Sequence, residues 1–377
     1  MLATLAFAIC AFAGLTHIVT ISTVIVRLRR PSRHAPADAA APLVSILRPI
    51  CGLENNLDRC IESSFRLAYP NYELIFCAED ETDEAVPLVR RLMATYPDVA
   101  ATLLIGRDRI GANPKLNNLA KGWKAARADW VILSDSNVVL PADYVEQLWS
   151  CWGGKTGLVS TAMVVAEPEG FAAEVECAYM NPYAARWMLV ADSFGLAYAH
   201  GKTVMLQRKT IEQAGGFAAL NQEAADELAA TRIVWRAGQR VRLAPKPVHQ
   251  PIGFRSFTTV VRRQLRWARL RRSGIPFLYA AEFFSCAVIP FAFAAGLAIA
   301  GLLSPLALAA YVVAWYGSDL VLTRAAGWPS SWRMPLALLV RDAIMPVIWF
   351  LAWFGDQSEW RGHAVSFSKR GQGKRAG

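Results

Sequence analysis

Two kinds of hydrophobic pattern divide the chain. Residues 2–26 contain no Asp, Glu, Lys or Arg, and residues 277–322 contain two acidic residues and no basic one. Apolar runs of this length match the hydrocarbon core of a bilayer, which is about 30 Å thick. Residues 43–254 instead alternate short β-branched runs with helical stretches, which is typical of a mostly parallel sheet with crossover helices. The pattern predicts an α/β fold flanked by transmembrane helices.

The same pattern places the elements of the α/β part. The predicted strands cover residues 43–47, 72–78, 102–105, 130–134 and 158–164. The predicted helices cover residues 56–65, 84–96, 116–126 and 141–152. Because the carboxyl ends of parallel strands meet at one edge of the sheet, where α/β proteins bind ligands, the residues that follow each strand are candidates for a site.

The N-terminal run is predicted to be a transmembrane anchor, residues 1–27. Arg27, Arg29, Arg30 and Arg33 lie at its end, and an excess of basic residues marks the cytoplasmic side of a membrane helix. A cleaved signal peptide is disfavoured because it needs basic residues before its apolar run. We therefore expect an integral membrane protein, in the inner membrane if the source is a bacterium, with the α/β part facing the cytoplasm.

The C-terminal third contains more apolar segments. Residues 277–322 are predicted to form two transmembrane helices. Residues 334–354 carry Arg341 and Asp342 at their centre, and each costs about 2.5–3.5 kcal/mol to insert. We therefore predict a re-entrant or interfacial helix there, followed by a basic cytoplasmic tail, residues 355–377. The alternative is a fourth transmembrane helix with the tail outside.

Polar residues follow two of the predicted strands directly. Asp80 lies at the tip of strand 72–78, and Asp135 and Asn137 follow strand 130–134. A carboxylate and an amide at the end of a buried strand can hold a divalent cation, Mg²⁺ or Mn²⁺, whose other ligands are water and diphosphate oxygens. We therefore predict Asp135 and Asn137 as metal ligands.

A second acidic pair lies further along the chain. Asp226 and Glu227 open a helical stretch that runs to Gly238. Two acids at this position can simply complement the helix dipole. Because metal and nucleotide chemistry is indicated upstream, either one is also a candidate general base.

Composition adds an anionic partner to the picture. The chain is 54% hydrophobic and 19% charged, with a formal net charge of +10, so it favours phosphate, a nucleotide or anionic lipid headgroups as partners. Residues 228–281 hold twelve Lys or Arg and no acid. Since these cations adjoin a membrane helix, lipid is favoured over nucleic acid.

The basic stretch is predicted to form an interfacial helix, residues 255–276. Arg263 and Arg266 are three residues apart and share a helix face, so two guanidinium groups can clamp a diphosphate. Trp267 is placed to stack on a sugar or a lipid. The simpler interpretation is a basic belt that binds anionic headgroups at the membrane surface.

Taken in order, these motifs resemble those of membrane-bound family 2 type glycosyltransferases, and more closely the ceramide glucosyltransferase family. The stretches that carry the resemblance are residues 44–52, 69–73, 111–118, 134–136, 170–173, 214–216 and 263–267. The resemblance implies a GT-A fold and inverting transfer of a hexose, with glucose expected, from a UDP-sugar to the hydroxyl of a membrane lipid. Ceramide is the expected acceptor, and a hopanoid or diacylglycerol are the alternatives.

The resemblance also implies roles for individual residues of the donor site. Asp80 corresponds to the aspartate that contacts the nucleotide, and Asp135 to the metal-binding aspartate. Lys115, in the Asn-Pro-Lys block, is a candidate contact for the donor diphosphate. The third acid of the family falls on Glu227 when counted back from the helix end, and a shift of one residue places it on Asp226.

The remaining candidates concern the acceptor. Arg263, Arg266 and Trp267 match the (Q/R)xxRW signature, which the resemblance places near the donor diphosphate and the acceptor entrance. His200 lies in a loop near the expected acceptor site, although an ordinary loop histidine is the simpler interpretation. A phosphate loop ending in Gly-Lys-Thr is excluded because Leu196 stands where that motif needs glycine. A non-catalytic lipid-binding scaffold on a decayed transferase fold is the competing class of function.

Overall fold

The computed structural model describes residues 1–30, 41–223, 225–355, 357–360 and 363–366. These residues form two compact units. The sheet unit is drawn from residues 31–164, 191–253 and 357–377, and the helical unit from residues 1–30, 165–190 and 254–356.

The sheet unit is built on seven strands in the order β3-β2-β1-β4-β7-β5-β8. The strands are β1 (Val44–Pro49), β2 (Tyr72–Ala78), β3 (Ala101–Ile105), β4 (Trp130–Ser134), β5 (Thr156–Ser160), β7 (Thr203–Gln207) and β8 (Arg240–Leu243). Strands β1 to β4 run parallel, whereas β7 is antiparallel to both β4 and β5. The carboxyl ends of β1, β2 and β4 therefore lie at the same edge of the sheet, as predicted.

Helices cover this sheet. They are α2 (Leu57–Glu62), α3 (Val86–Thr95), α4 (Pro114–Ala125), α5 (Tyr144–Trp149), α8 (Arg208–Gln213) and α9 (Asp226–Arg236), with the 3₁₀ segments η1 (Ser63–Arg66) and η3 (Phe217–Gln222). Helix α4 begins with Pro114 at its first position, and the Asn113 side chain accepts a hydrogen bond from the Lys115 N–H. Such a cap fixes where the helix starts, and so fixes the position of Lys115.

The strand predictions are confirmed for 72–78 and 130–134, and the prediction of one strand over 158–164 is wrong. Strand β5 ends at Ser160 and a separate strand, β6, begins at Met163. The β-branched composition continues through the break, but the backbone partners change: the Ser160 carbonyl accepts from Ala244 N–H, and the Ala162 carbonyl from Val248 N–H. Composition alone does not report such a change of partner.

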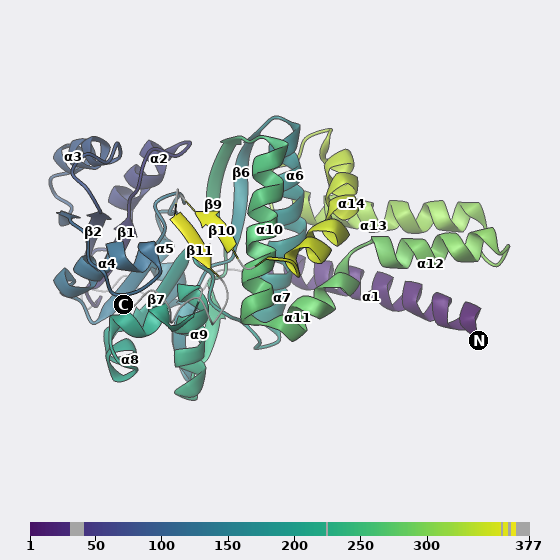
Figure 1. Cartoon of the computed structure of the whole chain (residues 1–377), viewed down its shortest axis with the longest axis horizontal. Coiled ribbons are helices and arrows are strands. Elements are labelled where there is room, and N and C mark those ends of the chain that lie inside the picture. The colour runs from purple at the N-terminus through teal and green to yellow at the C-terminus, as the bar shows by residue number, and fades with distance from the viewer. Residues whose placement is uncertain (31–40, 224, 356, 361–362, 367–377) are drawn as a thin grey trace. The chain divides into compact units, whose positions relative to one another are not determined.

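The helical unit contains the long apolar helices. Its elements are α1 (Leu2–Arg29), α6 (Phe171–Tyr179), the π-helical η2 (Met180–Ala185), α10 (Phe257–Gly274), α11 (Pro276–Glu282), η4 (Phe283–Ser285), α12 (Val288–Ile299), α13 (Pro305–Ala325) and α14 (Met334–Ala352). Helix α7 (Arg186–Ser193) and strands β6 (Met163–Glu169) and β9 (Val248–Phe254) cross the boundary between the units. Figure 1 shows α1, α12 and α13 side by side.

Four helical segments among the described residues are long and apolar enough to cross a membrane: residues 2–29, 276–299, 305–325 and 334–352. Large apolar side chains such as Phe12, Leu306 and Val313 are exposed on them, as expected of a surface that faces lipid rather than water. The helices of the predicted membrane part are therefore present, and α10 occupies the place of the predicted basic helix.

Helix α14 runs without interruption from Met334 to Ala352. The charges of Arg341 and Asp342 motivated the prediction of a re-entrant or interfacial helix. Both side chains are buried and form a bidentate pair, with distances of 2.9 and 2.8 Å. Pairing inside a bundle offsets much of the cost of inserting a charge. The location of residues 334–354 relative to the bilayer stays a prediction.

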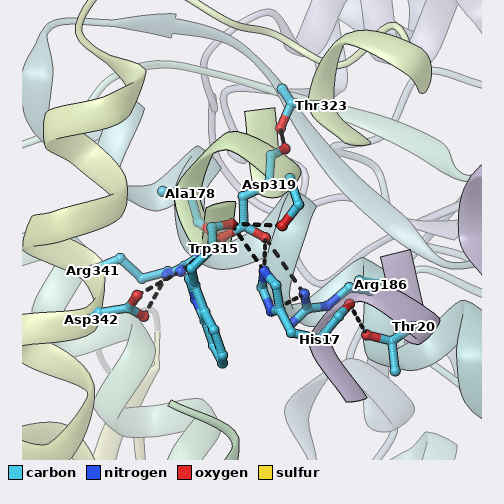
Figure 2. A network of polar contacts seen from close by, with 10 residues as sticks. His17, Thr20, Ala178, Arg186, Trp315, Asp319, Thr323, Arg341 and Asp342 are labelled. Atoms are coloured by element: carbon cyan, nitrogen blue, oxygen red, sulfur yellow. Dashed lines mark hydrogen bonds and ion pairs between the residues drawn. The ribbon is translucent and has the colours of Figure 1, made fainter. Parts of the chain in front are cut away.

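The charged pair on α14 belongs to a larger buried network. Asp319 on α13 has no exposed surface and lies 3.1 Å from the Arg341 guanidinium. Its other oxygen lies 3.5 Å from both Arg186 and His17. Figure 2 shows the side chains of His17, Arg186 and Arg341 pointing toward Asp319. The network ties α1, α7, α13 and α14 together within the helical unit.

The C-terminal segment is largely outside the described residues. Residues 356, 361–362 and 367–377 are not described, and β10 (Gln357–Trp360) pairs in antiparallel fashion with β11 (His363–Ser366). The prediction of a basic cytoplasmic tail over 355–377 falls mainly on those undescribed residues.

Candidate functional site

The register of two neighbouring strands brings a lysine to the predicted catalytic edge. In the antiparallel ladder of β4 and β7, Ser134 is paired with Thr203. Asp135 follows β4 directly and Lys202 precedes β7 directly, so the two residues lie opposite one another. The Asp135 N–H donates to the Lys202 carbonyl at 3.3 Å, and the Lys202 Nζ lies 2.9 Å from Asp135 Oδ2.

A second lysine reaches the same carboxylate from α4. Lys115 Nζ lies 3.1 Å from Asp135 Oδ1 and 3.0 Å from Asp226 Oδ2. It also donates to the Gly201 carbonyl at 3.1 Å. Lys115 thus joins the start of α4, the end of β4, the turn before β7 and the start of α9. We call Lys115, Asp135, Lys202 and Asp226 the lysine–carboxylate cluster.

Mutual attraction favours the charged forms of Asp135 and Lys115. Burial alone would raise the pKa of Asp135, but the ammonium groups of Lys115 and Lys202 hold it well below its usual range. Burial alone would lower the pKa of Lys115, but Asp135 and Asp226 raise it well above its usual range. At neutral pH the Asp135 carboxylate is therefore ionised beside the Lys115 ammonium group, an arrangement suited to binding a charged ligand.

Glu227, the residue after Asp226, has a raised pKa. Burial, together with the negative charge of Asp226, raises the pKa of Glu227 to about 8. A Cβ atom added at Gly201 would lie 3.2 Å from both carboxylate oxygens of Glu227, so the glycine leaves the space that this carboxyl group occupies. At pH 7 Glu227 is therefore mostly protonated and uncharged.

The predicted metal ligands have another partner. Lys202 Nζ donates to Asn137 Oδ1 at 2.8 Å as well as to Asp135, and the Asn137 amide donates to Glu54 Oε2 at 2.6 Å. Among the described residues there is no group of three or more His, Cys, Asp or Glu side chains that could hold a metal ion. Asp135 and Asn137 therefore do not form a protein cage for a divalent cation, and an ammonium group already contacts the oxygens predicted as ligands.

A buried arginine that the sequence did not single out fixes the turn carrying Asp135. Arg48 has no exposed surface. Its guanidinium donates to the carbonyls of Asp135 (2.8 Å), Val138 (2.9 Å) and Cys60 (2.7 Å), and to the Ser64 hydroxyl. Burial lowers the pKa of Arg48 to about 10, so it remains a cation at neutral pH. The available signal was a basic residue directly after the predicted strand 43–47.

Replacing Arg48 by Met is expected to destabilise the sheet unit by more than about 3 kcal/mol, because it removes the hydrogen-bond donor to the Asp135 and Val138 carbonyl oxygens. Thermal unfolding of the purified chain would measure the loss. Arg90→Met is the matched control, since Arg90 is a largely exposed arginine of the same unit. Equal melting temperatures for the two variants would contradict this role of Arg48.

Asp80 occupies the predicted sheet edge with mainly local contacts. It is exposed, and its Oδ1 accepts hydrogen bonds from the N–H and the hydroxyl of Thr82, which lower the pKa of Asp80. Asp83 instead accepts from Gly52 N–H and Ala85 N–H, consistent with a structural role at the start of α3. Asp80 thus lies at the predicted edge, and its contact with a nucleotide stays a prediction.

His200 adjoins the cluster through the turn that carries Lys202. The side chain is 9% exposed, and its ring lies 4.6 Å from that of Tyr198. Burial lowers the pKa of His200 to about 4, so the ring is neutral at pH 7. The backbone N–H of His200 donates to the Ser160 hydroxyl at 2.9 Å. The predicted contact of His200 with the acceptor stays a prediction.

The (Q/R)xxRW residues lie on α10, in the helical unit. Arg263 Nε donates to Glu176 Oε1 at 2.9 Å, and Arg255 lies 3.1 Å from the other oxygen of this fully buried carboxylate. The Arg263 guanidinium lies 4.8 Å from the centre of a ring of Trp267, in cation–π geometry. Glu176 therefore positions Arg263, and the predicted diphosphate clamp of Arg263 and Arg266 stays a prediction.

Comparisons with known proteins agree with this architecture. A model of glycosyl transferase family 21 matches residues 6–372. Ceramide glucosyltransferase 3 of Caenorhabditis elegans is 27% identical over 379 aligned residues, covering 97% of this chain and 80% of that protein. The ceramide glucosyltransferase of Komagataella phaffii is 42% identical over 99 residues, covering 25% of this chain and 19% of that protein.

A solved structure supports the fold. The mannosyltransferase from Pyrobaculum calidifontis, in complex with GDP-Man and Mn²⁺, superposes with a TM-score of 0.54 and 19% identity, covering 91% of this chain and 99% of that one. This likeness, with the seven-stranded sheet, confirms the predicted GT-A α/β fold.

Proposed function

The chain belongs to glycosyl transferase family 21 and is a glycosyltransferase, and from this premise we propose that it moves a hexose, with glucose expected, from a UDP-sugar to the hydroxyl of a membrane lipid. Ceramide is the leading acceptor, because the chain resembles ceramide glucosyltransferases over almost its whole length. A hopanoid or diacylglycerol would serve the same chemistry.

The observation that carries the proposal is that Lys115 contacts both Asp135 and Asp226, at 3.1 and 3.0 Å. One ammonium group thus links the acid at the end of β4, where the donor diphosphate is expected, to the acid at the start of α9, where the base is expected. The sugar that is transferred must lie between Asp135 and Asp226. A scaffold that had lost its activity would not need to keep them linked.

In the proposed reaction the acceptor oxygen attacks the anomeric carbon from the face opposite the leaving group. The bond between that carbon and the β-phosphate oxygen breaks, UDP leaves, and the configuration inverts. The acceptor hydroxyl gives its proton to a carboxylate. The ammonium groups of Lys115 and Lys202 stabilise the negative charge that builds up on the diphosphate.

We assign the base to Asp226 and not to Glu227. A base must be ionised to accept a proton, and Glu227, with a pKa of about 8, is mostly protonated at pH 7. Asp226 lies 3.0 Å from Lys115 Nζ, within the lysine–carboxylate cluster. Glu227 then acts as an uncharged neighbour whose carboxyl group can donate a hydrogen bond.

The helices and basic residues of the helical unit, together with His200, also have proposed roles. The helices able to cross a membrane suit a lipid acceptor that enters along the bilayer surface. Arg263, Arg266 and Trp267 on α10 are proposed to contact the donor diphosphate and the acceptor, and His200 the acceptor. The basic residues of α10 are proposed to bind anionic headgroups. A cytoplasmic location is proposed for the sheet unit, because Arg27 and Arg29 lie in the last turn of α1, before the chain enters that unit, and basic residues mark the cytoplasmic end of a membrane helix.

The expected divalent cation fits only in part. Mn²⁺ is present in the Pyrobaculum mannosyltransferase complex, and such an ion would neutralise diphosphate charge. In this chain Lys202 contacts both predicted ligands, Asp135 and Asn137. The reaction proposed above therefore includes no step through a metal ion.

A test of the product decides between an enzyme and a scaffold. The chain would be expressed in a host without glycolipids and supplied with ceramide, and the lipid extract analysed by mass spectrometry. We expect a new hexosylceramide, absent from cells that express Lys115→Met. A hexosylated hopanoid or diacylglycerol in a host that makes those lipids would change the acceptor, and no new glycolipid with any acceptor would contradict the proposal.

The raised pKa of Glu227 predicts a pH effect on donor binding. The carboxyl group is uncharged below pH 8 and ionises above it, adding a negative charge beside the diphosphate site. We therefore expect the affinity for UDP to fall as the pH rises through 8, and the fall to disappear in Glu227→Gln. Titration calorimetry between pH 6.5 and 9 measures both, and an unchanged pH profile in the variant would contradict this explanation.

A further inference from the structure

The Lys202 ammonium group occupies a built position. Strand register sets Lys202 opposite Asp135, and a backbone hydrogen bond of 3.3 Å joins the two residues. The next residue, Thr203, accepts a hydrogen bond from the buried Tyr144 hydroxyl at 2.9 Å. The side chain of Lys202 is only 16% exposed. This is the geometry of a fixed cation and not of a lysine on an open surface.

Its two acceptors are the two residues that the sequence predicts as metal ligands. Lys202 Nζ lies 2.9 Å from Asp135 Oδ2 and 2.8 Å from Asn137 Oδ1. A divalent cation bound to both oxygens would have to displace the ammonium group from both hydrogen bonds. The ammonium group and the metal ion are therefore alternatives at this point.

The local charge is positive in both cases. Asp135 with the ammonium groups of Lys115 and Lys202 carries a net charge of +1. A divalent cation in place of the Lys202 ammonium group would give +2, because Lys115 is present in either case. A diphosphate that approaches this edge therefore meets a positive charge from the lysines, smaller by one unit than the charge a metal ion would give.

Lys202 also retains a donor for the ligand. An ammonium group has three N–H donors. Among the described residues, Lys115 uses three contacts, to Asp135, Asp226 and the Gly201 carbonyl. Lys202 uses two, to Asp135 and Asn137. One donor of Lys202 thus remains for a phosphate oxygen.

We propose that the ammonium group of Lys202 replaces the divalent cation at Asp135, so that this chain binds the diphosphate of its donor without a metal ion. This inference rests on the proposed function, because it takes a nucleoside diphosphate as the ligand. Lys202→Met should free the position between Asp135 and Asn137, so that diphosphate binding by this variant depends on a metal ion.

The test measures UDP binding to the purified full chain by titration calorimetry, in EDTA and in Mn²⁺. For the unchanged chain we expect dissociation constants that agree within about twofold in the two conditions. For Lys202→Met we expect binding weaker by about 10- to 100-fold in EDTA, the loss of one charge-assisted hydrogen bond, and recovery in Mn²⁺. Lys246→Met is the matched control, because Lys246 is a largely exposed lysine of the same unit, and we expect it to behave as the unchanged chain does.

A second readout needs no nucleotide. Electron paramagnetic resonance of Mn²⁺ is expected to show a bound ion in Lys202→Met and none at this site in the unchanged chain, and Asp135→Asn added to Lys202→Met should abolish the bound signal. Thermal unfolding of each variant verifies that it is folded. If the unchanged chain binds UDP only in Mn²⁺, the inference is wrong while the transferase proposal stands. If it binds UDP in neither condition, both are wrong.

Discussion

Replacing Asp226 by Asn is expected to lower kcat for sugar transfer by about a thousandfold, whereas replacing Glu227 by Gln lowers it by no more than about tenfold. General-base catalysis typically contributes 10²- to 10⁴-fold, and an amide cannot accept the proton. Glu227 is mostly protonated at neutral pH, so the uncharged amide of glutamine resembles its resting state. The two substitutions are equally conservative, and each serves as the control for the other.

A comparison of kcat with the affinity for UDP shows whether Asp226 acts as the base or only binds the donor. Asp226→Asn should bind UDP at least as tightly as the unchanged chain, because it removes a negative charge next to Lys115. A large loss of kcat in Glu227→Gln with little change in Asp226→Asn would reverse the assignment. Full activity in both variants would show that neither Asp226 nor Glu227 is the general base.

The second large effect is expected in the helical unit, where Asp319→Asn should destabilise the fold by about 3–5 kcal/mol. Breaking a buried ion pair by removing one partner leaves an uncompensated charge, and this penalty exceeds the net contribution of the intact pair. Arg341 would keep Asp342 as a partner. Arg186 would lose its only carboxylate contact recorded among the described residues.

Thermal unfolding in detergent measures this effect, with Thr323→Val as the control. The Thr323 hydroxyl donates to the Asp319 backbone carbonyl, so the control removes a hydroxyl from the same buried region and no charge. A double-mutant cycle with Arg341→Met should show coupling between Asp319 and Arg341. A melting temperature for Asp319→Asn equal to that of Thr323→Val would show that the network contributes no more to stability than one hydroxyl group.

The sequence predicted best those features that depend on neighbouring residues. Strands 72–78 and 130–134 are short, mostly apolar runs, and Asn113-Pro114 is a local start signal for α4. The positions of Asp80 and Asp135 follow from these strands because parallel strands end at the same edge. The acidic pair Asp226 and Glu227 was visible in the sequence, and the family resemblance added Lys115, which the structure places in contact with both Asp135 and Asp226.

Features that depend on distant residues could not be predicted. Lys202 reaches Asp135 through the register of an antiparallel strand, and 67 residues separate them. The network around Asp319 combines His17 with Arg186 and Arg341, from separate helices. In the sequence, Arg341 and Asp342 indicated a high cost of insertion into a membrane. No residue near them in the chain shows that Asp319 lies beside Arg341.

The central claim is that the lysine–carboxylate cluster holds the donor diphosphate. The most direct test is an experimental structure of the full chain with UDP bound, at a resolution that places both phosphates. We predict phosphate oxygens within hydrogen-bonding distance of Lys202 Nζ and beside Lys115, with Asp226 facing the position of the anomeric carbon. A diphosphate bound elsewhere, with the ion pairs of Lys115 and Lys202 undisturbed and out of its reach, would contradict the account.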